Sequence, residues 1–282
     1  MQIDLDHPEE AEIRLRQLLE ESSGGGSLDA QAGILAQLAR VQGALGKFSE
    51  ARGTLQKLDE LAREESQTAK ILALIETGRL FVLEKTPSQA RPLFMEAWNL
   101  AGQSGDVSCA IDAAQMLAAI EPQKLQKDWT LKALRLAENS PEPIAKNWLG
   151  EIYTTLGWSE FNARQFESAL EWFKKALARI QPESSPRRAI IAQWAVGKTL
   201  RALNRFDEAF EIQSHLVEEL SRLSLKNGYV YEELAECLQS LKKTAEAQPY
   251  FDIAYHELAK DEWLSDNNPA RLKRLKDLGK SK

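Results

Sequence analysis

Few residues of this chain have the types and spacing that chemistry requires. The run Ala192 to Thr199, AQWAVGKT, ends like a phosphate-binding loop. Ala192 stands where that loop needs glycine, and the run lies within a helical pattern instead of between a strand and a helix. We therefore do not expect Lys198 to bind phosphate.

The histidines and cysteines also lack the spacing of a metal or catalytic site. His256 has no second histidine at the spacing of a zinc-binding helix, and His7 and His215 stand alone. Cys109 and Cys237 form no CxxC motif, which favours two reduced structural thiols, and a disulfide between them is the alternative. Nucleophile elbows and glycine-rich dinucleotide motifs are missing as well. We predict no metal and no cofactor, and an enzyme is the class of protein that we least expect.

Composition predicts a folded, all-α protein. Hydrophobic residues make up 43% and charged residues 28% of the 282 residues. Leu and Ala dominate, β-branched residues are sparse, and no alternating run suggests a strand. No apolar run approaches the ~18 residues of a membrane span. The N-terminal stretch is acidic and lacks the order of a secretory signal, so we expect a cytoplasmic protein.

The net charge of −6 is opposite to that of a typical nucleic-acid binder. Residues 270–282, ARLKRLKDLGKSK, are a local exception with six basic residues against Asp277. We interpret them as the solvated face of a terminal helix that turns Leu272, Leu275 and Leu278 inward, and a tail for nucleic acid or membrane is the alternative. We expect neither nucleic acid nor membrane as a partner.

A short corner motif returns along the chain. It reads LGKFSEA at residues 45–51, ARQFESA at 163–169 and LNRFDEA at 203–209. Ala169 and Ala209 lie 40 residues apart, and the 118 residues from Ala51 to Ala169 are close to three such steps. A fixed period of this size indicates supersecondary units that stack in a row.

Each unit is predicted to be an antiparallel pair of helices. In the first copy, the helical spacing of Leu35, Leu38 and Ala39 is broken at Gly46, and Ser49 is placed to cap a second helix. The same offsets return in further copies, one of them degenerate, which predicts about six units. Small residues recur where the two helices must cross, because larger side chains would overpack the contact.

One copy carries a known family's pattern. Its spaced positions are Leu156, Gly157, Phe166, Ala169, Phe173 and Ala176, followed by Pro182. They resemble the tetratricopeptide repeat (TPR) family, and the resemblance covers roughly residues 30 to 260. Glu160 departs from the pattern, and the spacing of 36 to 43 residues exceeds the ~34 of the family. The resemblance implies a right-handed superhelical α-solenoid of stacked antiparallel helix pairs.

The expected organisation has three parts. Residues 1–27 hold an N-terminal helix, with Pro8 in its first turn, and a flexible joint at 22–27, SSGGGS. Residues 28–260 form the array of about six hairpins. Residues 261–282 hold a capping helix that begins near Asn268 and Pro269, and the basic tail.

The resemblance also implies a binding face, the concave groove that the first helix of each pair lines. Carrying the corner register through these first helices places Arg40, Arg79, Gln115, Trp158, Lys198 and Glu236 at equivalent positions facing the groove. Further groove residues are Thr154, Phe161, Asn162, Trp194, Arg201 and Glu232.

These residue types suggest what the groove binds. Trp158, Phe161 and Trp194 would place aromatic surface in mid-groove, framed by the cations of Arg40 and Arg79 on one flank and of Lys198 and Arg201 on the other. Such a groove suits an acidic protein segment with an apolar anchor, bound as a helix or an extended peptide. In the alternative interpretation, Trp158 packs in the core, and Arg40 and Arg79 pair with acidic neighbours.

The sequence therefore predicts a non-catalytic protein–protein interaction scaffold or adaptor that binds a partner peptide or helix in its groove. The alternative is a regulatory sensor whose repeats bind a small ligand or short peptide and control another protein. The sequence indicates neither the identity of the partner nor the oligomeric state.

Overall fold

The computed structural model describes residues 7–22, 27–63, 66–180 and 186–280, without the side chains of residues 123 and 124. Every regular element in these residues is a helix, so the all-α prediction is confirmed. Contacts divide the chain into two compact units, residues 1–152 (unit 1) and 153–282 (unit 2).

The helices of the first half are α1 (Pro8–Ser22), α2 (Leu28–Ala44), α3 (Phe48–Arg63), α4 (Gln67–Leu83), α5 (Pro87–Ser104), α6 (Val107–Ile120), α7 (Gln123–Asn139) and α8 (Pro143–Lys146). They are followed by α9 (Leu149–Asn162), α10 (Phe166–Leu177), α11 (Pro186–Ala202), α12 (Phe206–Arg222), α13 (Gly228–Ser240), α14 (Thr244–Leu258), α15 (Glu262–Asn267) and α16 (Pro269–Gly279).

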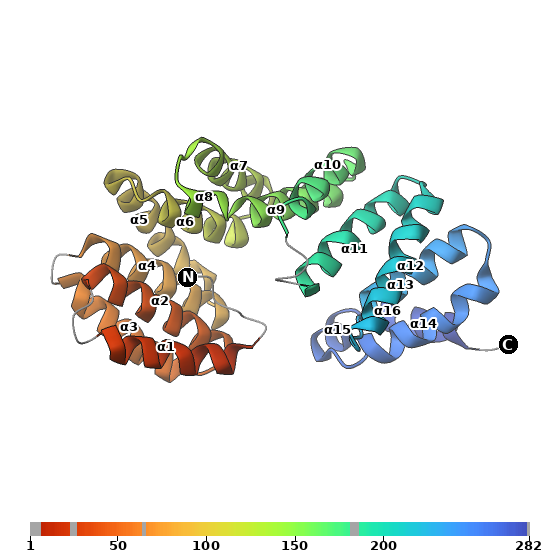
Figure 1. Cartoon of the computed structure of the whole chain (residues 1–282), viewed down its shortest axis with the longest axis horizontal. Coiled ribbons are helices and arrows are strands. Elements are labelled where there is room, and N and C mark those ends of the chain that lie inside the picture. The colour runs from red at the N-terminus through yellow and green to blue at the C-terminus, as the bar shows by residue number, and fades with distance from the viewer. Residues whose placement is uncertain (1–6, 23–26, 64–65, 181–185, 281–282) are drawn as a thin grey trace. The chain divides into compact units, whose positions relative to one another are not determined.

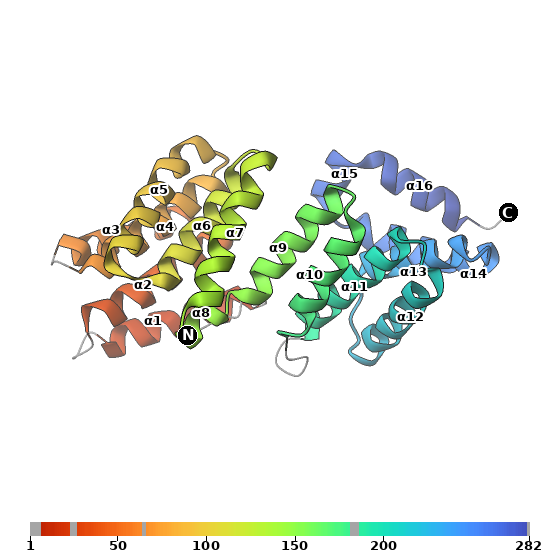
Figure 2. The ribbon, with the colours of Figure 1, turned by 90° about the horizontal axis from the view of Figure 1, so that it is seen from above.

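Successive helices pack as pairs, which Figure 1 shows as neighbouring antiparallel ribbons. The pairs are α2 with α3, α4 with α5 and α6 with α7 in unit 1, and α11 with α12 and α13 with α14 in unit 2. Gly157 and Trp158 of α9 contact Phe173 of α10, so these two helices form a further pair. We call the first helix of each pair the leading helix and the second the trailing helix. Leading helices also contact one another, α2 with α4, α4 with α6, and α11 with α13. Figure 2 shows the pairs from above. The hairpin predicted from the repeat is therefore confirmed.

The recurring corner has a backbone cause. Two positions before each of five trailing helices, one residue has a φ between 60° and 72°: Gly46, Lys85, Arg164, Asn204 and Lys242. This left-handed conformation reverses the chain in a short turn, and it is uncommon outside glycine and asparagine.

The expected N-cap at Ser49 is wrong. The backbone N–H of Ala51 already donates to the carbonyl of Lys47 at 3.0 Å, so α3 begins at Phe48. Ser49 consequently lies inside the first turn of α3. In α10 and α12 too, the corner phenylalanine is the first helical residue.

Small residues sit where the paired helices cross. A Cβ atom added to Gly78 would lie 2.5 Å from the ring of Phe94, and one added to Gly157 would lie 2.5 Å from the ring of Phe173. Both phenylalanines are fully buried. The trailing helix thus inserts its ring against the bare backbone of its leading helix, as the overpacking argument predicts.

Helices outside the pairs cover both ends of the described chain. At the N-terminal end, α1 packs on α2 and buries Leu15. At the other end, the Asn268 side chain accepts a hydrogen bond from the Arg271 N–H at the start of α16, and Leu272 and Leu275 join the core that contains Phe251. Most of the expected joint, residues 23–26, lies outside the described residues. No helix in the described part of the chain is both long enough and apolar enough to cross a membrane.

Candidate interaction face on the leading helices

Ion pairs join the leading helices of unit 1 in a fixed register. The Arg40 guanidinium of α2 donates to both carboxylate oxygens of Glu76 on α4, with Nε 3.1 and 3.2 Å away, and reaches Asp112 on α6 at 3.1 Å. Arg79 of α4 also binds Asp112. Glu76 and Asp112 each lie three positions before the residue equivalent to Arg40 in their own helix. A cation at the groove position of one leading helix therefore pairs with a carboxylate on the next leading helix. That carboxylate lies three positions before the groove residue of its own helix.

These unit 1 cations are already compensated. Two guanidinium groups face two buried carboxylates, since Glu76 and Asp112 are 2% and 5% exposed. Burial lowers the pKa of Arg40, but the charges of Glu76 and Asp112 outweigh it and raise that pKa above the ordinary value. Arg40 and Arg79 thus pair with acidic neighbours, as one of the two interpretations of the sequence held. They add no net charge to a binding face.

The same register joins leading helices in unit 2, but with a different ratio of cations to carboxylates. Lys198 of α11 lies 3.2 Å from Glu233 of α13, and Arg201 binds the other oxygen of the same carboxylate. Burial lowers the pKa of Arg201, but the hydrogen bond to Glu233 and the charge of that carboxylate outweigh burial and raise the pKa above its ordinary value. Two cations therefore share one buried carboxylate.

The C-terminal helix extends this cluster. Arg271 of α16 binds both oxygens of Glu232, one of them at 2.9 Å, and Arg274 binds Glu236. We call the residues of these contacts the unit 2 ion cluster: Lys198, Arg201, Glu232, Glu233, Glu236, Arg271 and Arg274. Four cations face three carboxylates in it, so it carries a net charge of +1.

Three aromatic side chains, one from each of three successive leading helices, lie beside the unit 2 ion cluster. The rings of Trp158 and Trp194 are 5.6 Å apart, and those of Trp194 and Tyr229 are 5.8 Å apart. We call these three residues the aromatic row. The Trp194 indole N–H donates to the Tyr229 carbonyl at 3.0 Å, and the Lys198 ammonium lies 5.4 Å from the Trp194 ring.

Trp158 is both packed and accessible. The ring of Phe173 lies 4.9 Å from its ring and that of Phe161 lies 5.6 Å from it, both in edge contacts. All members of the aromatic row are nevertheless only partly buried. Because Gly157 lets Phe173 approach the backbone of α9, the sequence itself prepares the support for Trp158. Core packing and exposure on the face therefore coexist at this residue.

The other predicted groove residues have different surroundings. Gln115 of α6 is 5% exposed, and its Oε1 has no hydrogen-bond partner. Thr154 is half-buried and makes interactions of its own, whereas Asn162 is exposed at the end of α9. The sequence predicted that two pairs of cations flank the aromatic residues. Arg40 and Arg79 belong to unit 1, however, whereas Trp158 and Lys198 belong to unit 2.

Several residues of the face were missed from the sequence. They are the carboxylates Glu76, Asp112 and Glu233 and the aromatic Tyr229. The carboxylates could have been found, since they share one register position three residues before Arg79, Gln115 and Glu236. Tyr229 gives no comparable signal, because it lies in the first turn of α13, outside the register used.

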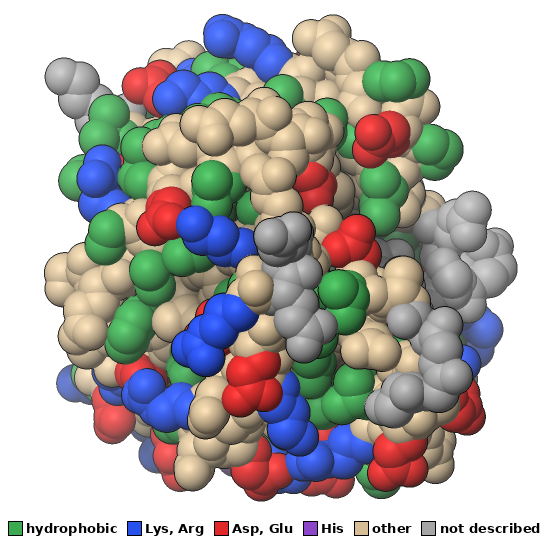
Figure 3. Space-filling view, turned by 90° about the vertical axis from the view of Figure 1, so that its left-hand side faces the viewer, with side chains coloured by type: hydrophobic (Ala, Val, Ile, Leu, Met, Phe, Trp, Pro, Cys, Tyr) green, Lys and Arg blue, Asp and Glu red, His purple; other side chains and the backbone are tan. Residues whose placement is uncertain are grey.

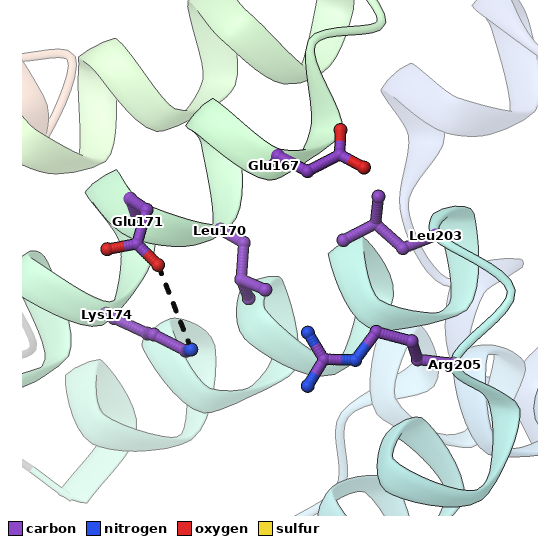
Figure 4. Close-up of a pocket in the computed structure, with 6 residues that line it drawn as sticks. All are labelled: Glu167, Leu170, Glu171, Lys174, Leu203 and Arg205. Carbon is purple, nitrogen blue, oxygen red and sulfur yellow. Dashed lines mark ion pairs between the residues drawn. The ribbon is translucent and has the colours of Figure 1, made fainter.

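The two pockets away from this face bring together no set of side chains that is typical of a catalytic site. One of about 250 Å³ in unit 2 is lined by Glu167, Leu170, Glu171, Lys174, Leu203 and Arg205. Figure 4 shows charged side chains of both signs around two leucines, with Glu171 and Lys174 4.0 Å apart. A second, of about 490 Å³ in unit 1, has mostly apolar walls that include Trp98 and Leu136. In the residues that the structure covers, no group of three or more His, Cys, Asp or Glu could hold a metal ion.

The end surface of unit 1 has a mixed character. In Figure 3 its hydrophobic side chains lie among acidic and basic ones. Large exposed hydrophobic residues of unit 1, such as Ile13 and Leu83, come from different helices. Single exposed apolar side chains are normal on protein surfaces.

Comparison with known proteins identifies the repeat. A family model described as tetratricopeptide repeat matches residues 149–181, which contain α9 and α10. The chain is 27% identical over 108 residues to the outer dynein arm-docking complex subunit 4 of Xenopus laevis. That match covers 38% of this chain and 20% of the subunit, so the chain spans only a small part of its relative.

Solved structures agree on the fold. A signal transduction ATPase with a tetratricopeptide repeat sensor from Pyrococcus horikoshii has a TM-score of 0.68 at 15% identity, over 97% of this chain and 42% of that one. The apo form of RapI gives 0.67 at 13% identity, over 96% and 81% of the two chains. The quorum sensor NprR from B. thuringiensis gives 0.65 at 15% identity, over 97% and 79%, and a further structure shows NprR with its cognate peptide NprX. Residues 149–181 thus match the tetratricopeptide repeat, and the chain has a TPR-like fold of paired helices. The number of its repeats stays a prediction.

Proposed function

We propose that this TPR repeat protein is a non-catalytic, cytoplasmic interaction module, and that the aromatic row of unit 2 binds a segment of a protein partner. One observation carries the proposal: three partly buried aromatic rings lie side by side next to a cluster with a net charge of +1. Large aromatic side chains next to a few charges dominate the binding energy of many protein interfaces.

The chemistry of the face describes the segment that it accepts. An apolar side chain of the partner would pack on Trp158 and Trp194, and one carboxylate would complement the charge that Lys198 and Arg201 share over Glu233. This keeps the acidic segment with an apolar anchor that the sequence suggested. It moves recognition to unit 2, because the guanidinium groups of Arg40 and Arg79 are compensated by buried carboxylates.

A regulatory sensor is the second candidate. It is supported by the likeness in fold to NprR, a quorum sensor whose structure with a peptide is known, and to the repeat sensor of an ATPase. Similarity at about 15% identity indicates the fold and does not indicate which ligand this chain would bind or which protein it would control. Such a sensor would use the same face for a short peptide.

Quantitative capture from an extract of the source cells tests the first proposal. Immobilised full-length chain is compared with Lys198→Gln and with Trp158→Leu, which removes ring surface and keeps an apolar group. The matched control is Trp263→Leu, because Trp263 is 67% exposed and lies on α15, outside the aromatic row. We expect one set of proteins to be depleted with both test variants and retained with the control. Equal retention by all variants, with unchanged circular dichroism, would exclude the aromatic row as the binding site.

The sensor candidate has a separate test. Short peptides and metabolites are screened for a compound that raises the melting temperature of the wild-type chain. A ligand that binds only the folded state stabilises it, so we expect at least one such compound. The sensor reading is abandoned if none of them shifts the transition.

A further inference from the structure

We infer that the partner segment is a proline-containing extended chain in the polyproline II conformation, with one acidic residue next to its prolines. The inference rests on the proposed function and names the class of segment that the aromatic row accepts. A helical ligand is the competing class.

A free hydrogen-bond donor separates the two classes. The Trp194 indole N–H is used on the Tyr229 carbonyl. The Trp158 indole N–H has no hydrogen-bond partner among the described residues, and it is not among the enclosed polar atoms that lack one. It is therefore open to a ligand acceptor. In a helix the backbone carbonyls are mostly occupied by the helix itself, whereas a polyproline II chain has no internal hydrogen bonds and offers its carbonyls.

The arrangement of the rings fits such a chain. Neighbouring rings of the aromatic row are tilted by 43° and 58° relative to each other, so they do not form a flat stack. Neighbouring ring centres lie 5.6 and 5.8 Å apart, close to the span of two residues of a polyproline II chain at about 3.1 Å per residue. Proline side chains pack against aromatic rings, and the preformed extended chain loses little entropy on binding.

The position of the charge adds an acidic residue to the motif. Lys198 lies against Trp194 at the middle of the aromatic row and shares Glu233 with Arg201. Because four cations face three carboxylates in the unit 2 ion cluster, a carboxylate beside the prolines is attracted and a basic residue is repelled. The motif therefore differs from one that is only apolar.

Two synthetic peptides test the inference on the full-length chain. The first is acetyl-PPEPPLPP-amide, and the second is acetyl-AAEAALAA-amide, which keeps the charge and the leucine but replaces every proline. A longer amphipathic helical peptide of the same charge represents the competing class. Binding is followed by isothermal titration and by tryptophan fluorescence at low and moderate salt.

The expected results are specific. The proline peptide binds, and the alanine peptide binds at least tenfold more weakly. Trp158→Phe keeps an aromatic ring and loses the N–H, and it weakens the proline peptide about fivefold, the value of one net hydrogen bond. Lys198→Gln weakens binding at low salt and reduces its salt dependence. The control Trp263→Phe leaves binding unchanged.

Other outcomes overturn the inference. If the helical peptide binds through Trp158 and the proline peptide does not, the inference is wrong and the proposed function stands. If Trp158→Phe binds the proline peptide as the wild type does, the role of the indole N–H is wrong, and with it the argument for an extended chain. If no peptide binds and the capture experiment also shows equal retention, both the inference and the proposed function are wrong.

Discussion

Arg79 on α4 binds the carboxylate of Asp112, which lies on the next leading helix three positions before the residue equivalent to Arg79. The pairs Arg40 with Glu76 and Lys198 with Glu233 follow the same rule. One offset therefore describes how charged groove positions of neighbouring repeats meet within each unit. At Trp158 that position carries an aromatic residue instead of a cation, and Trp158 begins the aromatic row.

The buried ion pairs predict a large effect on stability. Glu76→Gln removes one of the two buried carboxylates that Arg40 and Arg79 share. We expect a loss of about 3 kcal/mol in the free energy of unfolding, because two partly buried guanidinium groups then have only Asp112 to balance them. Urea denaturation followed by circular dichroism measures this. The control Glu96→Gln alters an exposed pair with Lys70, 3.7 Å apart, and should cost at most about 1 kcal/mol. Similar losses in both variants would contradict the prediction.

The crossing of α9 and α10 should not tolerate a methyl group. Gly157→Ala forces the Phe173 ring aside, and we expect it to lower the free energy of unfolding by about 1–3 kcal/mol. Gly53→Ala is the control, since a Cβ atom there meets nothing within 4 Å and α3 gains helix propensity. Denaturation midpoints of the two variants should therefore move in opposite directions. A midpoint of Gly157→Ala at or above that of the wild type would show that the ring yields without cost.

The docking of α1 should weaken in acid. Burial raises the pKa of Glu12, but its hydrogen bonds to Lys47 and Arg16 outweigh burial and hold that pKa below 4.5. A carboxyl group whose pKa is lower in the folded than in the unfolded state stabilises folding above the unfolded pKa, and this stability is lost as the pH falls through the folded pKa. Carbon-13 NMR titration of the Glu12 carboxyl should give a midpoint below 4.5 that rises in Lys47→Gln. An unchanged midpoint in that variant would remove the Lys47 bond as the cause.

Both cysteines should resist thiol reagents in the folded chain. Cys237 is fully buried, and burial raises its pKa to about 12; burial also raises the pKa of Cys109 above its ordinary value. The reactive thiolate is then scarce at pH 8, and the reagent must wait for the chain to open. Alkylation with iodoacetamide, read by mass spectrometry, should be much slower in native than in urea-unfolded protein. Equal rates at pH 8 would show that the sites open freely.

Much of the fold could be predicted from the sequence because its signals are local. The spacing of apolar residues predicts the helices, and the repeated corner predicts where the chain turns, since a left-handed residue is needed at Gly46 and its counterparts. Gly157 and Phe173 predict a close crossing because only a residue without a side chain admits the ring. The start of α3 was misplaced by this reasoning, because side-chain capping is only one way to begin a helix.

The face depended on tertiary structure. The sequence by itself determined which residues share the groove register, among them Arg40, Trp158 and Lys198, because the repeat period is written in residue types. It did not determine that Arg40 is neutralised while Lys198 shares its carboxylate with Arg201, or that Tyr229 completes the aromatic row. Those relations join residues more than thirty positions apart, and the three-residue offset between neighbouring leading helices decides which side chains meet. That offset is set by how the helices pack, so it became visible only in three dimensions.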